Sequence, residues 1–153
     1  MTTPYARTIL SWHYEPPYDV YNNDSATIEA DITDVFLNPA YHYYAVLDVT
    51  DMLVAYRCFG EDARVAGGDY SMDAVDMGGG LRPDLTGHGL GPTVMQAAMA
   101  FARQHFAPQA FRVTIATWNT RAQRACAKVG YRPSSTFLTA DGKPFVIMFQ
   151  RAE

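Results

Sequence analysis

The stretch that decides the fold is Leu81-Arg82-Pro83-Asp84-Leu85-Thr86-Gly87-His88-Gly89-Leu90-Gly91. A run with strand character, residues 73–81, leads into it, and a helical pattern leaves it at Pro92. Its alternate glycines let the backbone adopt positive φ and approach a ligand closely. Amide N–H groups ahead of a helix then converge on one concavity, where the helix dipole also favours an anion. The stretch therefore predicts a diphosphate site built mostly from backbone.

Two familiar phosphate motifs do not fit this stretch. An ATP-type phosphate loop needs a lysine followed by serine or threonine after its last glycine, but here Pro92 follows Gly91. A dinucleotide fingerprint needs G-x-G-x-x-G and an acid about 20 residues further on. Here the spacing is G-x-G-x-G, and the next strand ends at Trp118 and Asn119. A glycine-rich turn without any ligand is the remaining alternative.

The residues after the glycines read as helix, strand, helix and hairpin. Residues 92–106 have apolar positions at helical spacing, namely Val94, Met95, Ala98, Met99, Ala102 and Phe106. Residues 111–116 have the nearly continuous apolar character of a buried strand. Asn119 is placed to cap a helix over residues 120–129, and Gly130 is placed to end it. Residues 137–138 and 144–149 predict a hairpin around Asp141 and Gly142.

The residues before the glycines predict two helices and a hairpin. Residues 5–12 form a short helical pattern that ends at the prolines 16 and 17. Residues 25–37 form a weaker one, and residues 41–48 and 53–59 read as an antiparallel pair. The whole order predicts one α/β (α+β) domain over residues 1–153, with a mixed sheet flanked by helices on both faces.

The glycine stretch resembles the acyl-CoA-binding motif of the GNAT superfamily of N-acetyltransferases, in which an arginine or glutamine precedes x-x-G-x-G after a strand. Thr86 stands where that arginine or glutamine is usual, and His88 stands where a basic residue is frequent. Residues 119–131 resemble the family's second motif, an asparagine, a helix and a glycine-aromatic pair. The resemblance covers about residues 73–149.

This resemblance implies a mixed, mostly antiparallel sheet of about six strands and acetyl-CoA as the acyl donor. The chain begins almost at its first helix, so we expect the family's first edge strand to be absent or rudimentary. The implied cofactor-binding residues are Leu81, Arg82, Thr86, Gly87, His88, Gly89, Leu90, Gly91, Asn119 and Arg124. Asn119 can bond the pantetheine arm as well as cap its helix.

Transfer of an acetyl group to an amine also needs a base, an acid and an acceptor site. The catalytic candidates are Asp76 as base and Cys126 or Tyr131 as acid for the leaving thiolate. Cys126 stands where the family usually has a tyrosine. The expected oxyanion donor is a backbone N–H near Gly80 or Leu81. The acceptor candidates are Trp12, Tyr14, Glu15 and Tyr18, in a segment that resembles bacterial members of uncharacterised substrate.

Each catalytic and acceptor residue has a plainer alternative. Asp76 can be a structural ion-pair partner, and Glu15 can be either a base, an attractor of the amine or a solvated turn acid. Cys126 can be a small buried hydrophobe, and Tyr131 can simply pack. The base can also be an ordered water. A non-catalytic module that binds or senses acyl-CoA is therefore the alternative function.

Composition and charge narrow the class of protein. Apolar residues make up 48% and charged residues 18% of the chain, a globular balance. Residues 1–60 have a net charge of −6 and residues 61–153 one of +2, for a total of −4. The net charge argues against a nucleic-acid surface. Its distribution suits a cationic partner for the first part and an anionic partner for the second, or simply two solvated faces. Two separated cysteines and no membrane-length apolar run predict a cytoplasmic protein, and the histidines show no metal-ligand spacing. The resemblance also makes a homodimer an expectation.

Overall fold

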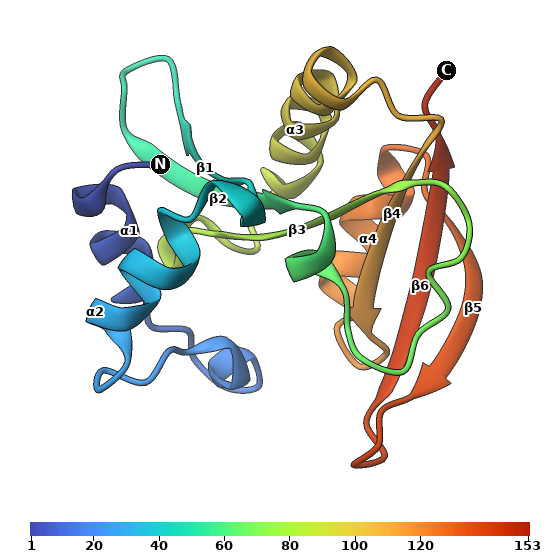
Figure 1. Ribbon diagram of the computed structural model, residues 1–153, viewed down its shortest axis with the longest axis horizontal. Helices are drawn as coiled ribbons and strands as arrows, with labels where there is room; N and C mark the ends of the chain where they lie inside the picture. Colours follow the sequence, from blue (N-terminus) through green and yellow to red (C-terminus); the bar gives the residue numbers. More distant parts are fainter. The chain divides into compact units, whose positions relative to one another are not determined.

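The computed structural model describes all 153 residues. Its α-helices are α1 (Thr3–Leu10), α2 (Ile28–Asp31), α3 (Gly91–Phe106) and α4 (Thr120–Lys128). Its strands are β1 (Tyr43–Leu47), β2 (Leu53–Phe59), β3 (Val75–Leu81), β4 (Ala110–Ala116), β5 (Arg132–Leu138) and β6 (Pro144–Arg151), all labelled in Figure 1. Short 3₁₀ or π turns cover Tyr18–Tyr21, Ile32–Phe36, Pro39–Tyr41, Glu61–Ala63 and Pro83–Leu85.

The six strands follow the order β1-β2-β3-β4-β6-β5. Only β3 and β4 run parallel; the pairs β1–β2, β4–β6 and β5–β6 are antiparallel. Two backbone hydrogen bonds show that β2 and β3 are also antiparallel. Arg82 N–H donates to the Val54 carbonyl, and Gly60 N–H donates to the Asp76 carbonyl. The predicted mixed, mostly antiparallel sheet of about six strands is confirmed. The first element of residues 1–153 is α1.

Two predicted elements differ from the observed ones. The predicted helix over residues 25–37 is a single turn of α2 followed by the π turn Ile32–Phe36. The strand predicted at residues 137–138 begins earlier, at Arg132, and becomes β5. Residues 132–136 are exposed and polar, with Pro133 among them, so they show no alternation that would mark a strand. Edge strands often escape periodicity for this reason.

The chain forms two compact units, one made of residues 1–58 and 79–86 and the other of residues 59–78 and 87–153. In the first unit, α1 begins at its cap Thr2 and packs its apolar side into a cluster with the π turn. The buried members are Ala6, Ile9, Leu10, Ile32 and Phe36. The Phe36 ring lies 4.4 Å from that of Tyr43, which ties the cluster to β1. No helix in the chain has the length and apolar character needed to cross a bilayer.

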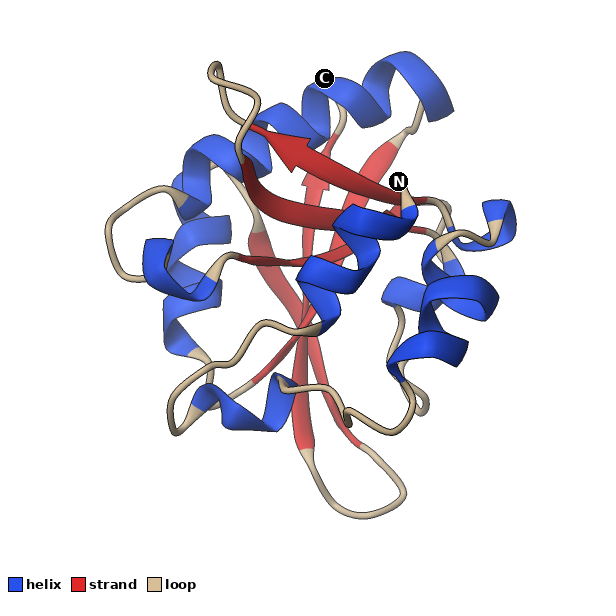
Figure 2. Cartoon of the chain, turned by 90° about the vertical axis from the view of Figure 1, so that its left-hand side faces the viewer, coloured by secondary structure: helices blue, strands red, loops and turns tan.

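The second unit has β4 at its centre. Residues 110–116 of β4 pair with residues 145–151 of β6, which in turn pairs with β5, and a long turn joins β5 to β6 (Figures 1 and 2). The buried side chains of α3 are Val94, Met95, Ala98, Met99 and Ala102, as the spacing predicted. A Cβ placed at Gly91 would lie 3.1 Å from the Cβ of Ala125, so the first turn of α3 lies close against α4.

We expect Gly79→Ala to destabilise the protein much more than Gly142→Ala. Gly79 has φ of 141°, and an added Cβ would lie 2.1 Å from the Tyr56 carbonyl oxygen. Gly142 also has positive φ, at 81°, but its Cβ would meet nothing within 4 Å. The expected losses of unfolding free energy are about 3 kcal/mol or more at Gly79 and about 1 kcal/mol at Gly142. Chemical denaturation measures both, and equal losses would contradict the close packing at Gly79.

Candidate functional site

The glycine stretch forms an open backbone turn ahead of α3. Gly87 and Gly89 have φ of 78° and 80°, and a Cβ at either would meet no other atom within 4 Å. Leu90 is the N-cap of α3, and no side chain caps the helix. The first turn holds Pro92 and no acid, so neither a side-chain acceptor nor a negative charge competes for its N–H groups. This geometry fits a bound anion such as a diphosphate.

Asn119 caps α4, as the sequence predicted. Its side-chain oxygen accepts the Ala122 N–H at 3.1 Å, and only 8% of the residue is exposed. Gln123 holds the same segment, because its side-chain amide donates to the carbonyls of Ala116 and Thr117. Arg124 lies exposed on α4. Since the start of α3 lies against α4, the second unit brings the glycine turn close to the helix that carries Arg124.

Arg82 and Thr86 have local partners within the first unit. The Arg82 guanidinium donates to Asp84 at 2.7 Å and to the Leu53 carbonyl of β2 at 2.9 Å. The hydrogen bond to Asp84 raises the pKa of Arg82 above its usual value. Thr86 donates to the Pro83 carbonyl at 2.7 Å and closes the turn before the glycines. These contacts favour a structural role for both side chains over the predicted contact with cofactor phosphates.

Among the predicted acceptor residues, Tyr14 lies at the end of β3. Its hydroxyl donates to the Leu81 carbonyl at 2.7 Å, and a Cβ at Gly80 would lie 3.0 Å from that hydroxyl. The Asn22 side chain binds both the N–H and the carbonyl of Tyr14, which fixes the loop there. The first unit thus joins the predicted acceptor segment to the predicted oxyanion-donor segment.

The other predicted acceptor residues have less specific surroundings. The Trp12 ring lies 6.1 Å from that of Tyr56 and packs against the cluster of the first unit. Glu15 is exposed in the proline turn. Tyr18 is half-buried at the start of the following 3₁₀ turn. Their part in binding an acceptor stays a prediction.

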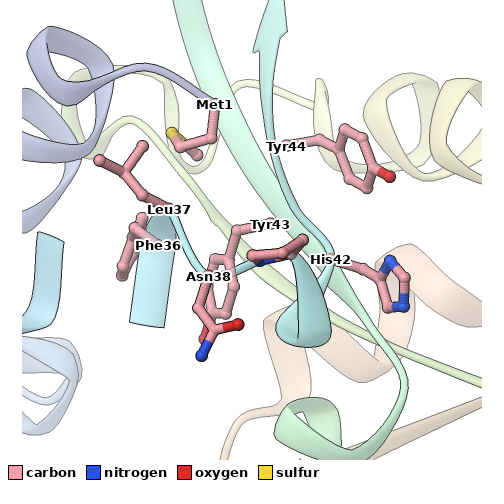
Figure 3. Close-up of a pocket in the computed structure, with 8 residues that line it drawn as sticks. Met1, Phe36, Leu37, Asn38, His42, Tyr43 and Tyr44 are labelled. Atoms are coloured by element: carbon pink, nitrogen blue, oxygen red, sulfur yellow. The ribbon is translucent and has the colours of Figure 1, made fainter. Parts of the chain in front are cut away.

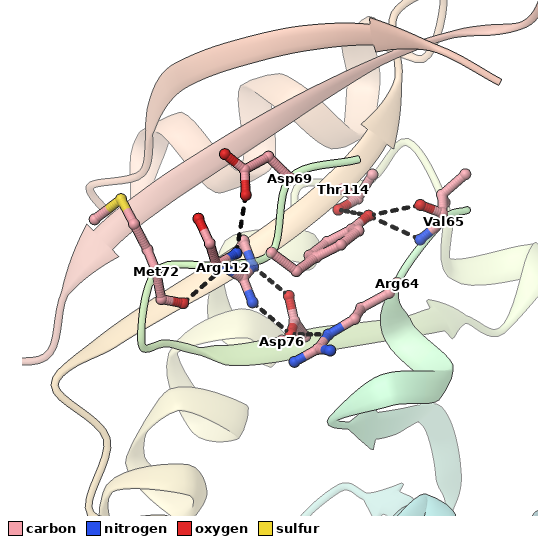
Figure 4. Close-up of polar contacts among 9 residues, drawn as sticks. Arg64, Val65, Asp69, Met72, Asp76, Arg112 and Thr114 are labelled. Atoms are coloured by element: carbon pink, nitrogen blue, oxygen red, sulfur yellow. Dashed lines mark hydrogen bonds and ion pairs between the residues drawn. The ribbon is translucent and has the colours of Figure 1, made fainter. Parts of the chain in front are cut away.

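Asp76 does not have the surroundings of a general base. It is 1% exposed, and its carboxylate is bound by two arginines, Arg112 of β4 and Arg64 of the preceding loop (Figure 4). Arg112 is fully buried and donates to both carboxylate oxygens. A carboxylate held in this way cannot approach an amine, so we correct its predicted role to a structural one. The sequence signal for this pair was a charged residue, Arg112, within the predicted buried strand 111–116.

Cys126 and Tyr131 are both buried in the second unit. Cys126 is 3% exposed on α4, and Tyr131 is fully buried after the Gly130 turn that ends this helix. The Tyr131 hydroxyl donates to the Met77 sulfur of β3 at 3.4 Å, so the ring reaches from the end of α4 to β3. Which of the two protonates a thiolate stays a prediction.

A separate hollow of about 320 Å³ lies in the first unit (Figure 3). The residues that line it are Met1, Phe36, Leu37, Asn38, Pro39, His42, Tyr43 and Tyr44. Its lining residues with polar side-chain atoms are Asn38, His42, Tyr43 and Tyr44. None of the predicted site residues lines it.

Residues 11–132 match the Acetyltransferase (GNAT) domain. Because this match covers most of the chain, the chain belongs to the GNAT acetyltransferase family. The family, the fold and the order of the two motifs confirm the resemblance found in the sequence. No protein of curated function matches the sequence.

Solved structures with the same fold include three acetyltransferases. Aminoglycoside acetyltransferase AAC(6')-Ib with coenzyme A has a TM-score of 0.78 and 17% identity, over 99% of this chain and 91% of that one. A GNAT-family acetyltransferase from Bacillus anthracis has a TM-score of 0.77 and 12% identity, over 99% of this chain and 92% of that one. A chimera of spermidine N-acetyltransferase SpeG from Vibrio cholerae and hSSAT has a TM-score of 0.71 and 15% identity, over 99% of this chain and 93% of that one. At these identities the likeness establishes the fold.

We expect Gly89→Asp to abolish the stabilisation of the protein by CoA. The substitution places a negative charge in the turn where the diphosphate is expected to bind. With CoA at about 100 times its dissociation constant, the wild-type protein should gain about 2.7 kcal/mol of stability. Thermal unfolding with and without CoA measures this gain.

Gly142→Asp is the matched control for this substitution. Gly142 has the same positive φ and the same open surroundings, but lies in the β5–β6 turn. The Gly142→Asp variant should keep the full gain in stability on addition of CoA. Full protection of the Gly89 variant, or equal loss in both variants, would contradict the location of the site.

Proposed function

We propose that the chain is an N-acetyltransferase that moves the acetyl group of acetyl-CoA to a primary amine by direct attack in a ternary complex. The observation that carries this proposal is the open glycine turn at the uncapped start of α3, within a chain of the GNAT family. The coenzyme A in the structurally similar AAC(6')-Ib supports the choice of donor. When bound, acetyl-CoA supplies the activated acyl group as a thioester.

The chain's own groups supply binding and orientation. Backbone N–H groups of residues 87–91 bind the diphosphate, Arg124 adds positive charge, and the His88 ring can donate a hydrogen bond, both from exposed positions. Asn119 bonds the pantetheine arm, as the family resemblance implies, in addition to capping α4. A backbone N–H near Gly80 or Leu81 stabilises the oxyanion. Holding the reactants in this way can contribute several kcal/mol to catalysis.

The acceptor is a cationic amine in this proposal. The net charge of −6 over residues 1–60 and the exposed Glu15 beside Tyr14 support it, since acids and aromatic rings attract ammonium groups. Similar structures include a spermidine N-acetyltransferase chimera and AAC(6')-Ib in complex with ribostamycin, and both spermidine and ribostamycin are amines. With Asp76 bound by two arginines, the amine loses its proton to an ordered water or to Glu15.

Tyr131 is the proposed acid for the leaving thiolate. Its hydroxyl reaches the β3 residue Met77, the residue that precedes the three glycines of that strand. Cys126 lies in the position of the usual tyrosine, but its short side chain is buried on α4. This replacement is also the observation that favours the second candidate function, a module that binds acyl-CoA without transferring it.

Cytoplasmic location, bacterial origin and a homodimer belong to the same proposal. Both cysteines are buried thiols, which agrees with a reducing compartment. The bacterial origin and the dimer rest on the family resemblance.

The transferase should release free CoA from acetyl-CoA in the presence of at least one primary amine. Thiol release measured with spermidine, ribostamycin and simple primary amines tests this directly. The amine dependence separates transfer from slow hydrolysis, for which an assay without amine is the control. Binding of CoA without turnover across the panel would instead favour the sensing module.

Tyr131→Phe should lower kcat about 100-fold if the hydroxyl protonates the thiolate, within the usual range for general acid catalysis. Cys126→Ala should change kcat less than about threefold, because a buried thiol that only packs contributes little to the chemical step. The dissociation constant for CoA should stay unchanged in both variants. The opposite ranking of the two kcat values would assign the acid to Cys126.

A further inference from the structure

One side chain joins the two ends of a loop between α1 and α2, in the blue segment that links these helices in Figure 1. The Asn22 side-chain oxygen accepts the Tyr14 N–H at 2.6 Å, and Asn22 Nδ2 donates to the Tyr14 carbonyl at 3.0 Å. The same Nδ2 lies 3.2 Å from Nδ1 of His13. Asn22 thus satisfies both backbone groups of one residue, as the backbone of a neighbouring strand would. We call residues 14–22, closed in this way, the Asn22 loop.

A second contact holds the start of the Asn22 loop against the end of β3. The Tyr14 hydroxyl donates to the Leu81 carbonyl at 2.7 Å. Gly80 leaves room for this contact, because an added Cβ there would lie 3.0 Å from the Tyr14 hydroxyl and 2.9 Å from the Tyr56 ring. All of these residues belong to the first unit. Tyr14 is therefore fixed at its backbone by Asn22 and at its side chain by β3.

The Asn22 loop carries three of the four predicted acceptor residues. Tyr14 and Tyr18 are half-buried, and Glu15 is exposed. Glu15 and Asp19 are the only charged residues of the loop, so it is anionic. Two backbone bonds, from Tyr18 to the Glu15 carbonyl and from Asn22 to the Asp19 carbonyl, span three positions each. These bonds shape turns within the loop, whereas the side chain of Asn22 closes it.

A loop that is closed before its ligand arrives lowers the cost of binding. Ordering a flexible segment during binding costs conformational entropy, which weakens the complex. The amide of asparagine suits this closure, because it offers an acceptor to an N–H and a donor to a carbonyl at the same time. An ionised carboxylate of the same size offers acceptors only. At this position it would place an oxygen against the Tyr14 carbonyl.

We propose that Asn22 is a positioning residue for the acceptor amine, because it closes the loop and so holds Tyr14 and Glu15 in place. This inference rests on the proposed function, in which these two residues attract the amine. Asn22 does not touch the amine and acts through the backbone of Tyr14. The diphosphate of the donor binds at the separate turn of residues 87–91. Loss of the closure therefore weakens binding of the amine and not binding of acetyl-CoA.

The test is Asn22→Asp, which keeps the size of the side chain but loses the bond that Nδ2 donates to the Tyr14 carbonyl. The amine is the best substrate among spermidine, ribostamycin and simple primary amines. Its KM should rise about tenfold with kcat little changed, the pattern of a binding loss shared by ground state and transition state. The KM for acetyl-CoA should stay within about twofold of the wild type. An unchanged KM for the amine, or an equal rise in both KM values, would overturn the proposal.

Asn38→Asp is the matched control. Asn38 is also half-buried in the first unit, and its amide likewise joins two backbone groups. It accepts the Ala40 N–H at 3.0 Å and donates to the Asp34 carbonyl at 3.2 Å, outside the Asn22 loop. This variant should lose a similar amount of melting temperature but keep the KM for the amine. A rise in KM equal to that of Asn22→Asp would attribute the effect to general destabilisation and so contradict the positioning role.

Hydrogen exchange of the wild-type protein keeps the test decisive if Asn22→Asp fails to fold. The Tyr14 N–H, bonded to Asn22, should exchange at least about tenfold more slowly than the same N–H in an unfolded peptide. Exchange at the unfolded rate would show that the loop is open in solution and would overturn the proposal. Absence of turnover with every amine would instead refute the proposed function, whatever the exchange rate of Tyr14.

Discussion

The structure depends on how a single buried carboxylate is neutralised. Asp76 lies in β3 with 1% exposure, where an unpaired charge would be strongly destabilising. Arg112 of the neighbouring strand β4 forms an ion pair with it, and Arg64 of the loop before β3 forms a second one. These contacts join residues 60–78, which include the first part of β3, to β4 within the second unit. The Asp76–Arg112 pair therefore joins β3, which leads to the glycine turn, to β4, which leads to Asn119.

The proposed cofactor site consists mostly of backbone groups. The glycine turn offers N–H groups at the start of a helix with no competing cap, and Gly79 allows β3 a conformation that a side chain would prevent. Such a site tolerates wide changes of side chain, because the anion is bound by groups that every residue has. This explains how Thr86 can stand in the place of the usual arginine or glutamine, with its hydroxyl used to close the preceding turn.

The sequence predicted the elements around the site well, because glycine, proline and helical spacing have local physical causes. Pro92, Asn119 and Gly130 mark helix ends through rules that involve only a few neighbouring residues, and the structure confirms all three. Long-range pairing has no such signal. The partner of Asp76 could not be read from the chain, and the bond from Tyr14 to Leu81 joins residues 67 positions apart. The role of Asp76 was predicted wrongly because its position along β3 was known but its neighbours were not.

The central claim is that the turn of residues 87–91 binds the diphosphate of CoA, and a crystal structure of the protein grown or soaked with CoA tests it most directly. Density for two phosphates is expected within hydrogen-bonding distance of the backbone N–H groups of Gly87, Gly89 and Gly91. CoA bound elsewhere, with this turn empty or filled by a side chain of the protein, would contradict it.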